Sequence, residues 1–190
     1  KWRLAFRFRS PVGLVLCGGG SHGAWQAGAL EALCEGGLAF ERAFGFSIGS
    51  LNGAAFLVDR LAEMREAWRE MDALRILRWK PAFTPGGFAP FSLYSGEALV
   101  DAAPFVRDDE DSKRRARCEL TVATLCARDR AIEYARFTPR GADGWDGPLY
   151  DRLRASCAVP MVFPPVRMGG ERGPRMLVDG GVPGRDRMRF

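Results

Sequence analysis

The sequence has 190 residues, a net charge of +5, and 47% hydrophobic and 27% charged residues, which is the size and composition of one globular domain. No stretch reaches the roughly 20 apolar residues that a membrane-spanning helix needs. No basic block carries interleaved aromatic residues, so a nucleic-acid partner is not expected. The five cysteines form no C-x-x-C pair and only one histidine is present. Neither a zinc site nor a disulfide framework is therefore expected, and free thiols favour a cytoplasmic location.

The chain alternates strand-like and helix-like segments after ten residues in which apolar and mostly basic side chains alternate. Those ten residues predict either a half-buried strand or a segment at a membrane surface. In chain order, we then expect a strand at 12–17, a helix at 27–34, a strand at 43–46, helices at 51–58 and 61–77, an irregular connection at 80–105, a charged exposed turn at 108–117, strands at 119–127 and 131–137, a helix at 149–157 and a strand at 176–178. This order predicts an α/β fold, a three-layer α/β/α sandwich around a central, mostly parallel sheet. It also predicts that 1–190 form a single domain.

The segment Gly45-Phe46-Ser47-Ile48-Gly49 matches the pattern G-x-S-x-G between an expected strand and an expected helix. A sharp strand-to-helix turn exposes the serine hydroxyl, and the flanking glycines allow the chain to pack tightly there. The positive end of the following helix would stabilise developing negative charge. Ser47 is thus the candidate nucleophile, although an ordinary tight turn would give the same pattern.

A nucleophilic serine needs a base, and the only histidine, His22, is a poor candidate. His22 lies in a glycine-rich stretch at the expected start of a helix, where the helix dipole disfavours an imidazolium. A carboxylate can take the serine proton if it lies within about 2.6–3.2 Å. Asp179 follows the last expected strand and precedes two glycines, so it is the candidate base. A plain turn is the alternative for this Asp-Gly-Gly.

The glycine-rich stretch after the first expected strand contains Gly18, Gly19, Gly20 and Gly23. Its backbone N–H groups would bind an anion at the start of a helix. One interpretation is an oxyanion hole for acyl transfer. The other is a G-x-G-x-x-G dinucleotide fingerprint with Glu41 near the position of the ribose carboxylate. The serine motif after the next strand has no role in nucleotide binding, so it favours the oxyanion hole.

Taken together, four ordered motifs resemble the patatin-like phospholipase family. They are GGGSHGAWQAGAL, GFSIGSLNGAA, ASCAVPMVFPPV and the DGG that begins at Asp179, and the resemblance extends over 12–182. It implies a Ser47–Asp179 dyad without a metal or cofactor, and an acyl-enzyme formed on Ser47 from phospholipids or other lipid esters. Gly18, Gly19, Gly20 and Gly23 would supply or shape the oxyanion hole.

We also expect an acyl pocket for the substrate and a peripheral contact of the protein with a membrane. Candidate pocket residues are Trp25, His22, Phe46, Met161, Val162 and Phe163. The alternative is a place in the hydrophobic core, which we expect for at least half of the apolar ones. Many family members carry Arg or Lys at the position of His22. Phe83, Phe88 and Phe91 would form an apolar lid. Family domains usually continue past the Asp-Gly-Gly motif, so a shortened form is expected here. An acyltransferase or thioesterase, a dinucleotide-binding protein and an inert lipid-binding scaffold are the alternatives.

Overall fold

The computed structural model describes residues 12–72, 92–94, 100–101, 103, 106, 109–139, 144–170 and 173–183. Within them the strands are β1 (Gly13–Leu16), β2 (Arg42–Gly45), β3 (Glu119–Cys126), β4 (Ala131–Phe137), β5 (Val166–Met168) and β6 (Arg175–Asp179). The helices are the 3₁₀ turn η1 (Gly20–His22), α1 (Gly23–Glu35), α2 (Ile48–Leu57), α3 (Leu61–Glu70), α6 (Glu110–Arg115) and α7 (Leu149–Ser156). The predicted alternation of strands and helices is confirmed.

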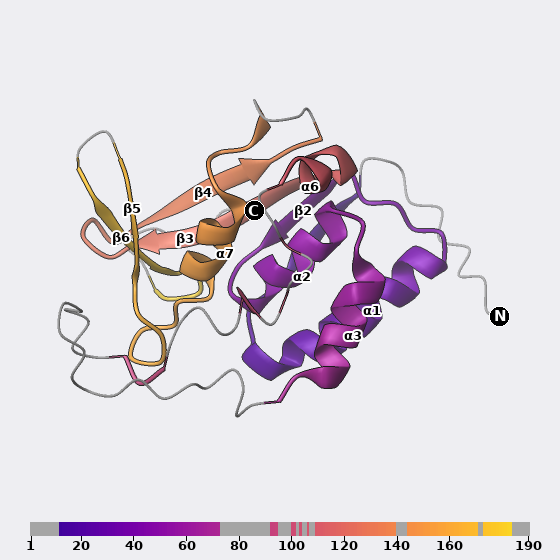
Figure 1. Cartoon of the computed structure of the whole chain (residues 1–190), viewed down its shortest axis with the longest axis horizontal. Coiled ribbons are helices and arrows are strands. Elements are labelled where there is room, and N and C mark those ends of the chain that lie inside the picture. The colour runs from indigo at the N-terminus through magenta and orange to yellow at the C-terminus, as the bar shows by residue number, and fades with distance from the viewer. Residues whose placement is uncertain are drawn as a thin grey trace.

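The described strands form one mixed sheet in which β1, β2 and β3 run parallel and the remaining pairs are antiparallel (Figure 1). The β3–β4 hairpin appears where the sequence predicts a strand pair. Helices α2 and α7 lie in front of the sheet in Figure 1, and they contact each other as well as the strands behind them. The sheet is thus parallel where the chain crosses over through helices, from β1 to β2 and from β2 to β3. It is antiparallel in the β3–β4 and β5–β6 hairpins and where β6 pairs with β3.

Two strands share one edge of β3 and meet end to end along it. β4 pairs with β3 from Leu120 to Cys126 and occupies the other edge. On the shared edge, β2 ends with Gly45 opposite Val122, and β6 runs the opposite way and ends with Asp179 opposite Thr124. The turn that follows β2, which contains Ser47, and Asp179 at the end of β6 are therefore brought to the same point of the sheet.

Helix α2 is the central helix of the core, and all ten of its residues are buried. Its sequence contains Gly49, Gly53 and two alanines, so its backbone approaches the sheet closely. A Cβ on Gly53 would lie 2.8 Å from Cδ1 of Leu120 in β3. Small residues on α2 therefore fix how deeply the start of this helix sits against the strands.

The prediction of an exposed turn at 108–117 is wrong, because Glu110–Arg115 form α6. The carboxylate of Asp109 accepts a hydrogen bond from the N–H of Ser112 at 2.7 Å and caps the helix. Acidic residues fill its first turn and basic residues its last turn, which suits the helix dipole. Strand β5 was not predicted. The expected terminal strand at 1–10 and the lid residues Phe83, Phe88 and Phe91 lie outside the described residues.

None of the helices in the described ranges has the length and apolarity that crossing a membrane requires. Within those same residues, no three His, Cys, Asp or Glu side chains gather in a way that would hold a metal ion.

Candidate active site

Ser47 occupies the sharp turn between β2 and α2 in a left-handed backbone conformation, with φ 53° and ψ −137°. This conformation is strained for a residue with a side chain. Two hydrogen bonds hold the turn: the N–H of Ser47 donates to Oγ of Ser156 at 3.0 Å, and Oγ of Ser50 donates to the Ser47 carbonyl at 2.6 Å. Ser47 is half-buried and is the N-cap of α2, so its hydroxyl lies at the positive end of a buried helix.

The glycines on either side of Ser47 are required by the space available. A Cβ on Gly49 would overlap the backbone carbonyl of Leu16, and one on Gly45 would lie 2.8 Å from the Gly49 oxygen. Real Cβ atoms do not approach backbone atoms that closely. The steric reason given for the G-x-S-x-G pattern therefore holds at both positions.

Asp179 ends β6 with its side chain buried, at 3% exposure. Its Oδ1 accepts a hydrogen bond from the N–H of Gly181 at 2.7 Å. Its Oδ2 is also buried and accepts no hydrogen bond of standard geometry within the described chain. Burial raises the pKa of this carboxyl above its ordinary value, and the Ser47 side chain and the Gly181 N–H partly offset that rise. The Ser47 side chain thus lies near enough to the Asp179 carboxyl to lower its pKa.

The buried thiol of Cys157 is a further neighbour of Asp179. Burial raises the pKa of Cys157 to about 12, and the Asp179 charge contributes to the rise. The thiol is therefore neutral at physiological pH, and it adds no second negative charge beside the carboxylate.

The glycine-rich stretch lies between the end of β1 and α1. Gly19 and Gly20 have φ of 154° and 56°. The backbone N–H groups of Gly18, Gly19 and Gly20 donate no hydrogen bond within the described chain, so they are free to bind an anion. Gly23 is the buried first residue of α1, and a Cβ there would overlap the Trp68 ring. Gly23 therefore shapes this stretch through packing.

A family model described as patatin-like phospholipase matches residues 14–183. The chain belongs to the patatin-like phospholipase family. It is 28% identical to YqhO of Bacillus subtilis (88% of this chain, 62% of that protein) and 27% identical to an NTE family protein of Mycobacterium tuberculosis (90% and 42%). A segment of 51 residues is 47% identical to neuropathy target esterase sws of Drosophila sechellia (27% and 4%). The chain thus spans less than two thirds of the length of these relatives.

The fold is also similar to the crystal structure of VipD from Legionella pneumophila. The TM-score is 0.61 at 13% sequence identity, over 96% of this chain and 47% of VipD. This likeness confirms the predicted patatin-like α/β fold. The sheet is partly parallel, whereas the sequence predicted a mostly parallel one.

Of the candidate pocket residues in this patatin-like chain, Phe46 lies between the two glycine-containing motifs. Atoms of its ring are 2.9 Å from the position of a Cβ on Gly18 and 3.0 Å from that of a Cβ on Gly181. Both glycines are therefore needed to accommodate the ring. His22 is exposed, and its Nδ1 donates to the Gly19 carbonyl at 3.0 Å, so it braces the loop from within.

Met161 and Phe163, two more of the six candidate pocket residues, have different surroundings. Met161 is 74% exposed and has a positive φ of 69°, whereas Phe163 is buried at 8% exposure. The exposed backbone near Met161 is held by Leu93, whose N–H donates to the Met161 carbonyl at 3.1 Å. Met161 is thus available to a ligand, and Phe163 is part of the protein interior.

Sequence reasoning missed two side chains that hold the patatin-like site together. Ser156 is fully buried, accepts from Ser47 and donates to the Ala123 carbonyl of β3 at 2.8 Å. Gln26 donates from Nε2 to the Cys17 carbonyl at 3.0 Å. The only signal for Ser156 in the sequence was a polar residue inside the apolar block ASCAVPMVFPPV.

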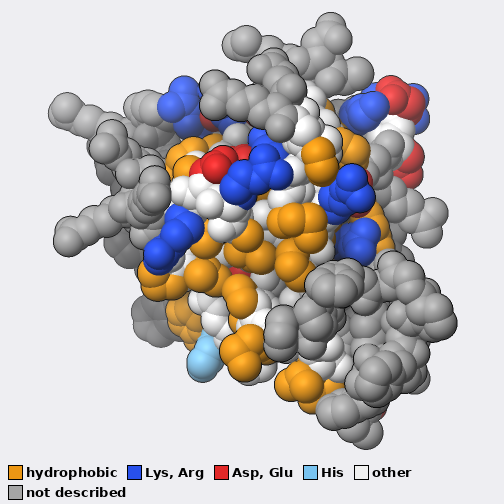
Figure 2. All heavy atoms as spheres, turned by 90° about the vertical axis from the view of Figure 1, so that its left-hand side faces the viewer, with side chains coloured by type: hydrophobic (Ala, Val, Ile, Leu, Met, Phe, Trp, Pro, Cys, Tyr) orange, Lys and Arg blue, Asp and Glu red, His pale blue; other side chains and the backbone are white. Residues whose placement is uncertain are grey.

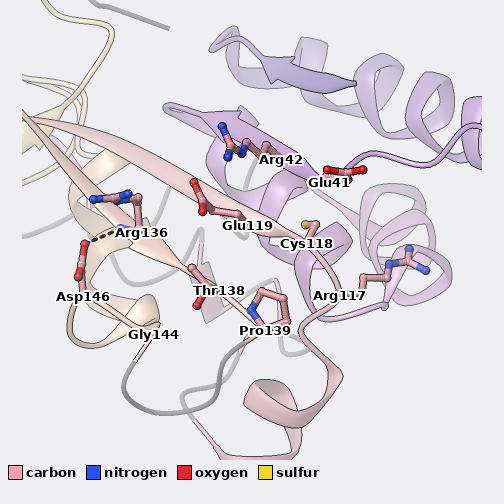
Figure 3. Close-up of a pocket in the computed structure, with 10 residues that line it drawn as sticks. All are labelled: Glu41, Arg42, Arg117, Cys118, Glu119, Arg136, Thr138, Pro139, Gly144 and Asp146. Carbon is pink, nitrogen blue, oxygen red and sulfur yellow. Dashed lines mark hydrogen bonds between the residues drawn. The ribbon is translucent and has the colours of Figure 1, made fainter. Parts of the chain in front are cut away.

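A pocket of about 620 Å³ lies at the other end of the parallel strands from Ser47 (Figure 3). Arg42 and Glu119, at the starts of β2 and β3, lie in its wall beside Arg136 of β4. Its three arginines are matched by two glutamates and one aspartate, so it has no excess charge for an anion. It contains none of the candidate catalytic residues and is not part of the candidate active site.

Proposed function

We propose that this chain is a serine hydrolase of lipid esters that works through a Ser47–Asp179 dyad. Ser47 is the nucleophile, Asp179 is the general base, and the N–H groups of Gly18, Gly19 and Gly20 form the oxyanion hole. The observation that carries the proposal is that Ser47, in its strained turn, lies beside the buried carboxyl of Asp179 where the ends of β2 and β6 meet along β3.

In the first half of the reaction, Oγ of Ser47 attacks the ester carbonyl while its proton moves to Oδ2 of Asp179. The carbonyl oxygen becomes an oxyanion, which the free N–H groups of the glycine-rich loop and the start of α2 would stabilise. The tetrahedral intermediate collapses, the C–O bond to the alcohol breaks, and Asp179 returns the proton to the leaving alcohol.

In the second half, water attacks the acyl-enzyme and Asp179 takes a proton from that water. The new oxyanion collapses, Ser47 leaves with the proton held by Asp179, and the fatty acid is released. The raised pKa of Asp179 suits both roles, because a more basic carboxylate is a better proton acceptor. The hydrogen bond from Gly181 leaves Oδ2 as the oxygen available for proton transfer.

A lipid substrate is supported by the family and by exposed apolar side chains near the candidate site. Trp25 of α1 is 78% exposed, Met161 is 74% exposed and Leu93 is 51% exposed. Figure 2 shows hydrophobic side chains gathered at the end of the molecule where β5 and β6 lie in Figure 1, with basic side chains beside them. Such a surface suits a peripheral contact with an anionic lipid interface. The name of the Drosophila sechellia relative is that of an esterase, which agrees with an ester substrate.

The test is the hydrolysis of a series of p-nitrophenyl esters by the wild-type chain and by Ser47→Ala, Asp179→Asn and His22→Ala. Loss of turnover in the first two variants, with a small decrease in the third, would support the dyad. Turnover that persists in Ser47→Ala would overturn it. Labelling of the wild-type chain with a fluorophosphonate, followed by mapping of the modified residue, tests Ser47 directly as the nucleophile.

A further inference from the structure

The glycine-rich loop is held at both of its ends by side-chain amides. Before the loop, the Cys17 carbonyl accepts a hydrogen bond from Nε2 of Gln26 at 3.0 Å. After it, the Gly23 carbonyl accepts one from Nδ2 of Asn52 at 2.9 Å. The residues between these ends are largely exposed, so packing alone does not fix the loop.

The two ties are joined to each other through Asn52. This side chain is fully buried, and its Nδ2 also donates to Oε1 of Gln26 at 2.9 Å. Its Oδ1 accepts a hydrogen bond from Nε1 of Trp68 in α3 at 3.0 Å. A carbonyl only accepts and an indole N–H only donates, so Gly23 and Trp68 together define the orientation of the amide.

Asn52 also belongs to the helix that begins directly after Ser47. Asn52 therefore holds one end of the loop directly and the other end through Gln26. This loop carries the proposed oxyanion donors. The ring of Trp68 packs where Gly23 would carry a Cβ, so α3 closes the assembly from outside. Loop, nucleophile helix and α3 thus form one hydrogen-bonded unit.

We propose that Asn52, Gln26 and Trp68 form a clamp that positions the glycine-rich loop relative to Ser47, and that they are positioning residues for acyl transfer. The proposal rests on the proposed function. The clamp sets the separation between the attacking oxygen and the oxyanion donors before substrate arrives, so that no reorganisation is needed during the reaction. A misplacement of about 1 Å at such a site can cost on the order of 100-fold in rate.

Two variants break the clamp on its accessible sides and leave the buried Asn52 in place. Gln26→Met removes the tie to Cys17, and Trp68→Phe removes the indole N–H while keeping an aromatic ring against Gly23. Each is expected to lower kcat on p-nitrophenyl butyrate by about 10-fold or more, with KM changed by less than about 2-fold. Inhibition by a trifluoromethyl ketone, whose adduct with serine carries an oxyanion, should weaken in parallel. The double variant should lose less than the product of the two single losses, because both act through Asn52.

Glu31→Gln is the matched control. Glu31 also links α1 to α3, through an exposed ion pair with Arg65 at 2.6 Å, and its loss should leave kcat unchanged. The ¹⁵N order parameters of Gly18, Gly19 and Gly20 report the loop directly and should fall in both clamp variants but not in the control.

Falls in both kcat and order parameters would support the clamp. Order parameters that do not change would overturn the clamp as a positioning device. So would order parameters that fall while kcat stays the same. If the wild-type chain showed no Ser47-dependent turnover, the proposed function would fail, and the order parameters would still decide whether the clamp holds the loop.

Discussion

The backbone N–H of Ser47 donates a hydrogen bond to Oγ of Ser156, 109 residues further along the chain. The same Oγ donates to the Ala123 carbonyl of β3. One buried hydroxyl thus ties the strained turn before α2 to the end of α7 and to the central strand. The turn has a positive φ that Ser47 would not adopt without such restraint.

Ser156→Ala should therefore both weaken the fold and slow the reaction. It leaves the N–H of the half-buried Ser47 without an acceptor, which costs about 1–3 kcal/mol in the free energy of unfolding. A fall in kcat of about 10-fold or more is expected, because the proposed nucleophile loses its orientation. Urea unfolding and turnover of a soluble ester measure the two effects.

Ser112→Ala provides the comparison for that variant. Ser112 is equally buried, and its Oγ has no hydrogen-bond partner within the described chain. Its removal should change neither stability nor turnover appreciably. Similar losses in both serine variants would mean that Ser156 acts only by filling space.

The raised pKa of Asp179 predicts a pH-dependent activity. If Asp179 is the base, it must be ionised to accept the Ser47 proton, so kcat/KM for a soluble ester should fall as the pH decreases through the pKa of Asp179. Because burial raises that pKa above its ordinary 3.8, the acid limb should lie above the usual range of an aspartate. A pH–rate profile from about pH 4 to about pH 9 measures it. An acid limb at or below the ordinary value would contradict the assignment.

The same shift predicts that Asp179→Asn stabilises the protein at neutral pH. A carboxyl whose pKa is higher in the folded state than in the unfolded state loses stability as the pH rises from about 3.8 through the folded pKa. The variant removes this cost, so its Tm should exceed that of the wild type above the window, by roughly 2–4 °C for each kcal/mol relieved. The difference should shrink as the pH approaches 3.8. A wild-type Tm equal to that of the variant at neutral pH would argue against a charged, poorly solvated Asp179.

Gly49→Ala should be among the most damaging single-methyl additions in the described chain. The new Cβ would overlap the Leu16 carbonyl, so either β1 or α2 must move, at a cost of about 3 kcal/mol or more. Gly28→Ala adds the same methyl in α1, where nothing lies within 4 Å, and should stabilise by up to about 1 kcal/mol. Thermal unfolding of the two variants compares them, and equal effects would refute the steric argument.

Trp25→Ser and Met161→Ser test the proposed contact with lipid. Both side chains are more than two thirds exposed, so the fold should tolerate the changes. Hydrolysis of anionic phospholipid vesicles should fall several-fold, while hydrolysis of a soluble short-chain ester should stay the same. Val15→Thr, on the edge strand β1, is a control with an exposed apolar residue outside the proposed contact. Equal losses on both substrates would argue against a membrane role for Trp25 and Met161.

Short-range patterns in the sequence predicted much of the fold. The apolar run before Gly18 became β1, the run before Ser47 became β2, and the segment around Arg128-Asp129-Arg130 became the turn of the β3–β4 hairpin. α6 differs from the predicted turn although its signals are local: the charges of 110–115 are ordered along the helix dipole, and Asp109 caps its start.

The long-range parts of the candidate site were not predictable in the same way. Nothing near Ser156 in the sequence indicates that it accepts a hydrogen bond from Ser47, and nothing near Gln26 indicates that it reaches Cys17 and Asn52. Such contacts depend on where helices pack, and packing is decided by the whole chain. The sequence did identify Ser47, Asp179 and the glycine-rich loop as candidates, because each has a local motif. Their catalytic roles stay predictions.

The order of the strands along the chain has a consequence for a polypeptide that is still being synthesised. The glycine-rich loop and the turn at Ser47 leave the ribosome before Asp179, because Asp179 belongs to β6, which follows every other described strand. If Asp179 is the base, a nascent chain presents a nucleophile without its proton acceptor until β6 pairs with β3. The proposed hydrolase would then gain its activity only after its last described strand has docked, and it would be inert toward cellular lipids before that moment.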